Sequence, residues 1–450
     1  MRANAGTDEP RLPDTLATWV AKQRWYAGKG SEPRLERIGG WSVGDASVRI
    51  STHYILDRGL TSIRLYQVPL TERVEPLDDV AAIGIVDGVY IYDAPHDPAY
   101  APALLDLIVT ETAVDDARGH RQPGTPALRV ANSAVLRGEQ SNTSIICEVE
   151  DGSPVIIKVF RSLHHGDNPD VILQSAIAAA GSLLVPTSVG YISGQWRDSG
   201  QPDRIARGHI AFAQEFIPGA TDAWRIALAA AATGTDFSAE ARSLGEATAQ
   251  VHATLAAVLP TRQPSPADID EIVAGMRGRL DLALLEVPAL EEYRALIEAV
   301  FEGARDAPWP ALQRIHGDFH LGQVLAAPDR GWVLVDFEGE PLRAMTERSE
   351  PDVTLRDVAG MLRSFDYVAG SVALTSGGET PSDWAASARH SFVDGYIAGS
   401  GLDIRDHREL LDAFEIDKAL YEAVYEAGNR PDWIEIPVAA IRRLAERRVR

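Results

Sequence analysis

Apolar and polar positions follow two different periods in the first quarter of the chain. Residues 12–27 place Leu, Trp and Val side chains three or four positions apart, which predicts an amphipathic helix. Residues 41–56 and 61–70 often alternate apolar and polar side chains, as the strands of a half-buried sheet do. A second helix is predicted at residues 101–112. Residues 115–126 are rich in Gly, Pro and charge, and we interpret them as a linker.

A second β-rich block follows and gives way to a long helical region. Five strands are predicted, at residues 129–136, 144–150, 153–160, 188–193 and 209–216. A helix between the third and fourth strands runs from Pro169 to about Ala180, because an Asn-Pro-Asp opening favours a helix start. From residue 222 onward the pattern is mostly helical, with Ala-rich helices expected at residues 222–232, 239–257, 288–305, 381–398 and 407–427.

The pattern therefore predicts an α+β chain of three parts. Residues 1–125 form a β-rich N-terminal domain, residues 126–220 a small β-rich lobe and residues 221–450 a large helical lobe. We find no internal repeat, which argues against a solenoid or propeller. Because ligand sites occur preferentially between domains, we expect a cleft between the β-rich and helical lobes to carry the function.

Composition and charge narrow the range of partners. The 450 residues include 65 Asp and Glu against 43 Lys and Arg, a formal net charge of −22. A protein with this net negative charge repels phosphate backbones and anionic lipids, so we expect neither nucleic acid nor a membrane surface as a partner. It does not exclude ATP, because a local basic pocket with Mg²⁺ can act within a negative envelope. Cys147 is the single cysteine, which excludes an intrachain disulfide and a cysteine-built metal site.

The sequence shows no targeting signal that we recognise. Residues 1–14 have no apolar core for export, and no apolar run is long enough to span a bilayer. We therefore expect a cytoplasmic protein.

The most informative stretch for chemistry is IHGDFHLGQVL at residues 315–325, followed by WVLVDFEGE at residues 332–340. Phosphoryl transfer needs a carboxylate that orients the acceptor hydroxyl, together with an amide and a second carboxylate that hold Mg²⁺ against the phosphates. Asp318, Gln323 and Asp336 supply these three groups in the order found in kinases. An alternative is that the two Asp residues only cap turns.

A zinc site is a second alternative for the same stretch. His316 and His320 lie four residues apart, which is a spacing that zinc ligands use. Gly317 and Gly322 make the segment a loop rather than a helix, and no third His or Cys ligand is near in the sequence. We therefore favour the phosphoryl-transfer interpretation.

Two upstream features fit the same chemistry. Lys158 lies inside the apolar strand VIIKVF, and a lysine in such a place needs an anionic partner such as ATP phosphate. An edge-strand lysine that reaches solvent is equally compatible. A polar turn that can cover phosphates with hydroxyl and backbone N–H donors precedes this strand. It consists of Gln140, Ser141, Asn142, Thr143 and Ser144.

These motifs together resemble the actinobacterial maltokinases. The matching segments are EQSNTS, IIKVF, HGDFHLGQVL, DFEGEP and LRDVAGMLRSFDY, with QRWYAGKG near the start and DKALYEAVYEAGNRPDW near the end. The resemblance implies a bilobal protein-kinase-like fold, similar to aminoglycoside phosphotransferases, with an N-terminal β-rich cap domain. It also implies ATP and Mg²⁺ as cofactors.

Carried over by position, the resemblance implies roles for individual residues. Asp318 becomes the catalytic base, Gln323 and Asp336 the Mg²⁺ ligands, and Lys158 the phosphate-binding lysine. The segment Gln214, Glu215 and Phe216 becomes the hinge, where backbone groups meet adenine. Asp357 becomes a brace for the catalytic loop, although a carboxylate at a helix N-terminus is an equally good interpretation.

One departure from the maltokinase pattern concerns the partner of Lys158. Maltokinases usually carry Glu two residues after Asn-Pro-Asp, and this chain has Ile172 there. Asp170 or Gln174 are the possible substitutes.

Residues 415–433 are the expected acceptor region, where aromatic rings can stack on a pyranose and charged groups can bond its hydroxyls. Glu415, Lys418, Glu422 and Glu426 also have the three- and four-residue spacing of a solvated, salt-bridged helix face. The expected sugar contacts are Asp318, His320, Tyr421, Glu422, Tyr425, Glu426, Arg430 and Trp433, with Asp432 beside them.

Carboxylates in this region favour a cationic sugar. We therefore expect phosphorylation of the 6-hydroxyl of glucosamine, as in the glucosamine kinases similar to maltokinases, and keep maltose phosphorylated at its anomeric hydroxyl as the alternative. A catalytically silent kinase fold that only binds ligands is a further alternative, and an aminoglycoside antibiotic is a less favoured acceptor. For Trp25–Gly30 in the cap, packing on the sheet is favoured over contact with nucleotide.

Overall fold

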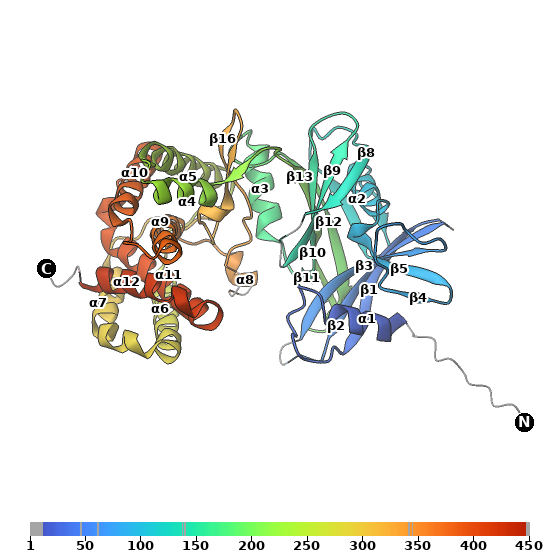
Figure 1. Cartoon of the computed structure of the whole chain (residues 1–450), viewed down its shortest axis with the longest axis horizontal. Helices are drawn as coiled ribbons and strands as arrows, with labels where there is room; N and C mark the ends of the chain where they lie inside the picture. Colours follow the sequence, from blue (N-terminus) through green and yellow to red (C-terminus); the bar gives the residue numbers. More distant parts are fainter. Residues whose placement is uncertain are drawn as a thin grey trace, which may run out of the picture. The chain divides into compact units, whose positions relative to one another are not determined.

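The computed structural model describes residues 12–446 except Ala46, Thr61, Ser62, Arg137, Glu139, Gln140, Pro341, Leu342 and Ala344. The chain divides into two compact units. Unit 1 comprises Met1–Ser175 and Pro186–Pro218, and unit 2 comprises Ala176–Val185 and Gly219–Arg450. Helices and strands are labelled in Figure 1.

Unit 1 begins with α1 (Leu12–Val20) and an antiparallel sheet in the order β1-β2-β3-β5-β4. The strands are β1 (Leu35–Gly44), β2 (Val48–Asp57), β3 (Arg64–Arg73), β4 (Gly84–Val86) and β5 (Val89–Asp93). Helix α1 is shorter than predicted, because the chain turns after Val20 and brings the Trp25 ring to 5.9 Å from that of Trp19. The aromatic positions that suggested a longer helix therefore pack within a turn.

A seven-stranded sheet forms the rest of unit 1, in the order β6-β7-β12-β13-β10-β9-β8. Its strands are β6 (Ala113–Val114), β7 (Ala117–Arg121), β8 (Val130–Val135), β9 (Asn142–Val149), β10 (Val155–Phe160), β12 (Ser188–Arg197) and β13 (Ile205–Glu215). The helices of this part are α2 (Tyr100–Val109) and α3 (Pro169–Ala179).

The predicted linker at residues 115–126 is wrong, because it contains β7, which pairs with β12. Gly119 in β7 lies against the carbonyl of Leu107 on α2, where a Cβ atom would collide. The glycine therefore permits close packing of a helix on a strand, whereas the sequence pattern suggested flexibility.

The two sheets of unit 1 share one hydrophobic core. Trp41 and Tyr54 of the first sheet and Ile157 and Ile192 of the second belong to the same cluster of buried side chains. A two-residue strand, β11 (Ser162–Leu163), continues the chain after β10 and pairs with β3 of the first sheet. Strand β10 is therefore joined to the cap by both packing and backbone hydrogen bonds.

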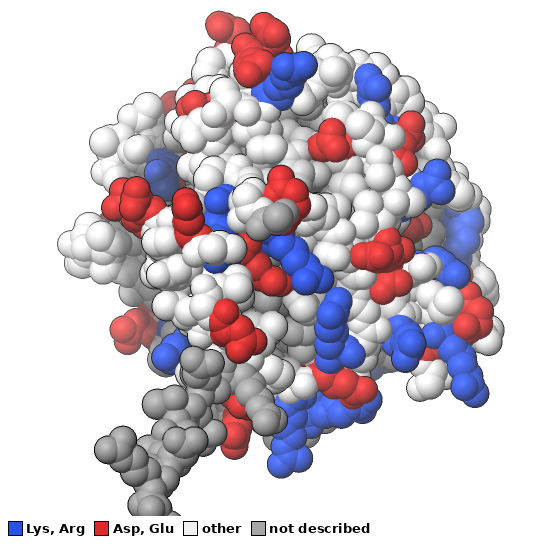
Figure 2. All heavy atoms as spheres, turned by 90° about the vertical axis from the view of Figure 1, so that its right-hand side faces the viewer, with Lys and Arg blue, Asp and Glu red and all other residues white. Residues whose placement is uncertain are grey.

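On the face seen in Figure 2, basic side chains lie among acidic ones, so that face is not uniformly negative.

Unit 2 is mainly helical. A small sheet of β14 (Thr221–Asp222), β15 (Val324–Ala327) and β16 (Gly331–Leu334) accompanies the helices. These are α4 (Ala223–Thr233), α5 (Ser238–Val258), α6 (Pro266–Glu286), α7 (Arg294–Asp306), α8 (Met345–Arg348), α9 (Leu355–Ser376), α10 (Ser382–Ser400), α11 (Arg408–Asn429) and α12 (Glu435–Glu446). Among the described residues, no helix is both long enough and apolar enough to cross a membrane.

Candidate functional site

The loop that contains Asp318 is held in place by a buried carboxylate on α9. Asp357 accepts hydrogen bonds from the backbone N–H groups of His316, at 2.8 Å, and of Gly317, at 2.9 Å. Its Oδ2 also lies 2.9 Å from Nε2 of His252 on α5. Burial acts to raise the pKa of Asp357, but these hydrogen bonds and the nearby imidazoles outweigh it and lower that pKa. Both interpretations of Asp357 hold, because it braces the loop from the first turn of α9.

Asp318 itself forms an ion pair with a partly buried lysine. Nζ of Lys418 on α11 lies 2.9 Å from Oδ1 of Asp318 and 2.8 Å from Oε1 of Glu340. Burial acts to raise the pKa of Glu340, but the charges of Lys418 and Arg343 dominate and lower it to about 2. The two carboxylates in turn raise the pKa of Lys418 against the effect of burial. Lys418 therefore links the loop that contains Asp318 to helix α11.

The sequence pattern did not reveal this pair. Lys418 has the spacing of a solvated helix face, but its side chain is only 16% exposed. Glu340 closes the motif DFEGE and is buried. One signal was available in the sequence, because Lys418 lies between the apolar residues Ile416 and Leu420, which pack in the core.

Gln323 and Asp336 lie side by side, as the kinase order predicts. Nε2 of Gln323 donates to Oδ2 of Asp336 at 3.0 Å, which directs the amide nitrogen towards the carboxylate. Asp336 follows β16 by two residues and has a positive φ of 66°. This sparsely populated backbone conformation is often found at functional sites.

The two histidines of the loop bond to backbone groups, one after β16 and one within the loop. Nε2 of His316 lies 3.0 Å from the carbonyl oxygen of Val335, and Nδ1 of His320 accepts from the N–H of Gly322 at 3.0 Å. Burial lowers the pKa of His320. The structure thus gives both rings a role in shaping the loop, and the zinc interpretation gains no support.

A cavity of about 430 Å³ in unit 2 is lined by both the loop that contains Asp318 and helix α11. All eight residues expected to contact the sugar line it: Asp318, His320, Tyr421, Glu422, Tyr425, Glu426, Arg430 and Trp433. Trp224, Ser364, Tyr367 and Lys418 line it as well and were not predicted. Asp432 is not among the lining residues.

Both glutamates of the cavity already have a basic partner. Oε2 of Glu422 accepts from the fully buried Arg363 at 2.7 Å and 3.0 Å. Glu426 accepts from Arg430 at 2.6 Å and 2.9 Å and from the hydroxyl of Tyr367 at 3.1 Å. Burial raises the pKa of Glu422 despite its arginine partner. The carboxylates are therefore fixed acceptors.

The aromatic rings of the cavity are also engaged. The Arg430 guanidinium lies 4.4 Å from the ring centre of Trp433 and 5.6 Å from that of Tyr425. Nζ of Lys418 lies 4.9 Å from the ring centre of Tyr421. Each ring thus has a cation near it, and the ring of Trp433 is also stacked with that of Tyr367, with 6.3 Å between the ring centres.

In unit 1, Lys158 on β10 has an acidic partner. Its Nζ lies 3.2 Å from Oδ2 of Asp170, a carboxylate that is almost fully buried in the first turn of α3. Of the two substitutes considered for the usual glutamate, the structure thus selects Asp170. The amide of Gln174 is buried, and it forms no hydrogen bond with the described residues.

The polar turn before β10 is described in part. Gln140 lies outside the described residues, Ser141 precedes β9, and Asn142, Thr143 and Ser144 form its start. Ser144 lies opposite Lys158 in the β9–β10 pairing. The part of the turn that is described therefore sits beside the lysine.

The expected hinge ends strand β13. Gln214 and Glu215 are its last two residues, and Phe216 follows. The N–H of Glu215 donates to Thr187 at 2.8 Å and that of Phe216 to Pro154 at 2.8 Å. The N–H groups of these two residues are therefore already used within unit 1.

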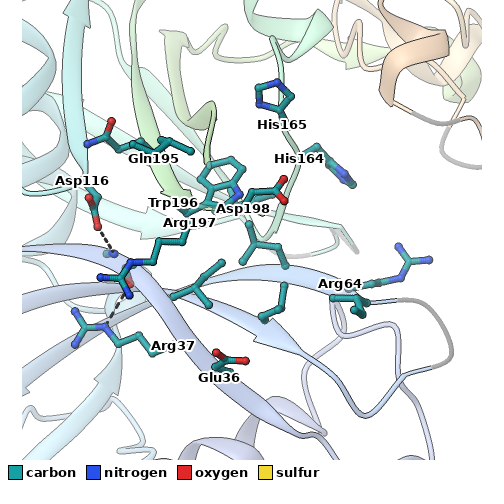
Figure 3. Close-up of a pocket in the computed structure, with 18 of the residues that line it drawn as sticks. Glu36, Arg37, Arg64, Asp116, His164, His165, Gln195, Trp196, Arg197 and Asp198 are labelled. Atoms are coloured by element: carbon teal, nitrogen blue, oxygen red, sulfur yellow. Dashed lines mark hydrogen bonds between the residues drawn. The ribbon is translucent and has the colours of Figure 1, made fainter. Parts of the chain in front are cut away.

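A groove of about 1070 Å³ lies elsewhere in unit 1, between β1, β12 and the segment after β10. Figure 3 shows its charged residues, among them Arg37, Arg197 and Asp116. Asp116 accepts from the N–H of Gly40 at 3.1 Å, and Arg37 donates to the carbonyl of Gly39. None of the residues predicted to bind nucleotide, metal or sugar lines this groove. The groove is therefore not part of the candidate site.

Two family models match the chain. The maltokinase N-terminal cap domain matches residues 19–97, and the phosphotransferase enzyme family matches residues 134–410, more than half of the chain. The expected resemblance and the expected fold class, including the N-terminal cap, are both confirmed.

Individual proteins with the same organisation are also similar. A glucosamine kinase of Streptacidiphilus jiangxiensis is 28% identical over 377 residues, which are 78% of this chain and 82% of that protein. One from Mycolicibacterium smegmatis is 28% identical over 397 residues, 82% of this chain and 93% of that protein. The solved structure of a glucosamine kinase in complex with glucosamine, ADP and inorganic phosphate has a TM-score of 0.70 at 21% identity, covering 97% of this chain and 99% of the other. At that identity the likeness concerns the fold.

Proposed function

The chain belongs to the phosphotransferase enzyme family, and from that premise we propose that it is an ATP-dependent sugar kinase. It transfers the γ-phosphate of ATP to the 6-hydroxyl of D-glucosamine and yields glucosamine 6-phosphate and ADP. One observation carries the proposal. The cavity of unit 2 places Asp318 of the catalytic loop among Tyr421, Glu422 and Glu426 of α11. An acceptor held by α11 would thus present a hydroxyl to the catalytic carboxylate.

Asp318 is the catalytic base of this proposal. Because Lys418 bonds Oδ1, the other carboxylate oxygen is the one that orients the sugar hydroxyl and accepts its proton as the phosphoryl group transfers. Asp357 holds the backbone of the loop, so the position of Asp318 does not depend on the substrate. The geometry is therefore arranged before the sugar binds.

Gln323 and Asp336 are the residues that would hold Mg²⁺. An amide oxygen and a carboxylate are ligands that suit this hard cation, and Nε2 of Gln323 faces Asp336, which leaves Oε1 of the same amide as a possible ligand. When bound, the ion neutralises charge on the phosphates. Lys158, fixed by Asp170, would grip the phosphates from unit 1, with Asn142, Thr143 and Ser144 beside it.

Glucosamine is preferred to maltose on the strength of the relatives that span most of the chain, which are glucosamine kinases. The carboxylates Glu422 and Glu426 suit an ammonium group as well as hydroxyls. Maltose stays the second candidate, because the cap of this chain matches that of maltokinases.

The decisive experiment measures ADP release with Mg-ATP and glucosamine, maltose or no sugar, and locates the new phosphate by phosphorus-coupled NMR. A 6-phosphate of glucosamine supports the proposal. Activity with maltose alone, giving a 1-phosphate, refutes the choice of sugar. Thermal stabilisation by Mg-ATP with no ADP release under any condition would identify a binding protein instead.

A further inference from the structure

A single carboxylate on α9 gathers three arginines from three helices of unit 2. Oδ2 of Asp366 accepts from Nη1 of Arg363, also on α9, at 2.7 Å. The same oxygen accepts from Nη1 of Arg389 on α10 at 3.2 Å and from Nη2 of Arg443 on α12 at 2.8 Å. Burial acts to raise the pKa of Asp366, but the charges of these arginines outweigh it and lower that pKa. Asp366 is therefore the anion that allows the three cations to lie together.

Arg363 connects this carboxylate to the cavity that Asp318 lines. It is fully buried, and its Nε and Nη2 bond Oε2 of Glu422 at 3.0 Å and 2.7 Å, while its Nη1 bonds Asp366. Both bonds to Glu422 go to Oε2, which leaves Oε1 for a ligand in the cavity. The direction in which Glu422 presents that oxygen thus depends on Arg363, and the position of Arg363 depends on Asp366.

The third arginine of the group comes from the last helix of the chain. Helix α12 packs closely on α9, because a Cβ atom added at Gly370 would lie 2.6 Å from the side chain of Ile436. The side chain of Arg443 is 41% exposed, whereas that of Asp366 is 10% exposed and that of Arg363 is fully buried. The ion pairs therefore run from the surface of α12 to the wall of the cavity.

The bonds of this group depend on one another. Arg363 and Arg389 each have a second carboxylate, which is Glu422 for the first and Glu415, at 2.7 Å, for the second. Asp366 carries one negative charge for three guanidinium groups, so a change in one of its ion pairs alters the other two. Loss of Arg443 would remove the bond that fixes Asp366 from α12. Arg363 would then have a less fixed partner on the side opposite Glu422.

We propose that Arg443 and Asp366 are positioning residues of the sugar site, through which the last helix fixes Arg363 and hence the direction of Glu422. The proposal rests on the proposed function, since it assumes that Glu422 bonds the sugar. No described residue of α12 lines the cavity, and the proposal nevertheless makes this helix a determinant of sugar affinity.

Two neighbouring arginines of α12 supply the test and its matched control. Arg443→Gln removes the cation from Asp366. Arg442→Gln is the control, because Arg442 is similarly exposed, at 45%, and donates to the hydroxyl of Tyr293 at 3.0 Å instead. Steady-state kinetics should show a KM for glucosamine about fivefold higher in Arg443→Gln and unchanged in Arg442→Gln. The KM for ATP should stay within about twofold in both variants. Arg443→Lys, which keeps a cation, should recover part of the loss.

The melting temperature separates positioning from a general weakening of α12. Both arginines are partly exposed, so the two Gln variants should melt within about 2 °C of each other. An unchanged KM for glucosamine in Arg443→Gln overturns the positioning role. An equal rise of that KM in both variants overturns it as well, because the effect would then belong to the helix and not to Asp366.

Crystal structures of the sugar-free variants supply a measurement that does not depend on the reaction. In Arg443→Gln, Arg363 and Glu422 should no longer keep both bonds within about 3.5 Å, whereas Arg442→Gln should keep both. Both bonds retained in Arg443→Gln overturn the positioning role. A wild-type chain that does not phosphorylate glucosamine refutes the proposed function, and the crystal structures then still decide whether α12 fixes Glu422.

Discussion

Replacing Lys418 with Met should cost both stability and rate, because this lysine neutralises two carboxylates of unit 2. Glu340 is 5% exposed, and its pKa falls from 4.5 to about 2 in the folded chain, mainly because of the charges of Lys418 and Arg343. That difference corresponds to about 3 kcal/mol of stability at neutral pH. Breaking a buried pair by removing one partner costs about 3–5 kcal/mol. We therefore expect Lys418→Met to lower the melting temperature by about 10 °C at pH 7.

The stability that Glu340 contributes should depend on pH in a definite direction. Because the folded-state pKa of Glu340 lies below its unfolded value of 4.5, its contribution is fully present above about pH 4.5 and is lost as the pH falls towards 2. The gap in melting temperature between wild type and Lys418→Met should therefore be largest near neutral pH and narrow on acidification. Arg408→Met is the control, because Arg408 pairs with Asp412 on the same helix but is itself 48% exposed, so solvent screens this pair more than that of Lys418.

Activity should change along with stability. Without Lys418, Oδ1 of Asp318 loses its 2.9 Å partner, so we expect kcat to fall at least about tenfold while the Kd for Mg-ADP stays within about twofold. Differential scanning fluorimetry from pH 7 to pH 3 and steady-state kinetics measure both effects. A variant as stable as Arg408→Met, or a gap that is constant over this pH range, would refute the ion-pair reasoning.

Three further changes test the proposed reaction. Asp318→Asn should lower kcat by about 100- to 10,000-fold with little change in the Kd for Mg-ADP, and a variant that keeps most of its rate would remove Asp318 as the base. Asp170→Asn should raise the KM for ATP about tenfold because Lys158 loses its 3.2 Å partner, whereas Ile172→Ala, at the position of the usual glutamate, should leave that KM unchanged. Glu422→Gln should raise the KM for glucosamine and not that for ATP, with Asp432→Asn, outside the cavity, as its control.

Local patterns in the sequence were sufficient for most of the fold. Alternating strands and Ala-rich helices predicted β10, α5 and α11 close to their observed bounds, whereas the run predicted at residues 41–56 is divided between β1 and β2. Helix α6 was missed because its helical signal lies in a capping box at Ser265 and Asp268 rather than in a run of Ala. Strand β7 was missed because its Gly and charged residues are typical of a loop, and only the packing of α2 explains the glycine. The signal for α6 is local in the sequence, whereas that for β7 depends on a neighbour in space.

In the candidate site, too, contacts within a short segment were predicted from the sequence, whereas contacts between distant segments were not. The motif order predicted that Gln323 and Asp336 lie together, since both are fixed by one short loop and the following strand. Lys418 meets Asp318 and Glu340 from 100 and 78 residues away, and no local period reports such a contact. Arg161 likewise bonds Thr143 and Asp93, which lie 18 and 68 positions away in the sequence. Ion pairs between distant segments are thus what the sequence alone left unassigned.

The net charge of the chain has a limited bearing on the choice of sugar. Asp318, Glu422 and Glu426 line the cavity, but so do the cations Lys418 and Arg430, and Arg363 bonds Glu422 from behind. An ammonium group would therefore share these carboxylates with groups already present, and it would gain less than from three unpaired carboxylates. Discrimination between an amino sugar and a neutral one must then depend on where the fixed acceptor oxygens lie. Arg363 and Arg430 hold Glu422 and Glu426 in place before the sugar arrives, so the arginines contribute to selectivity by fixing geometry.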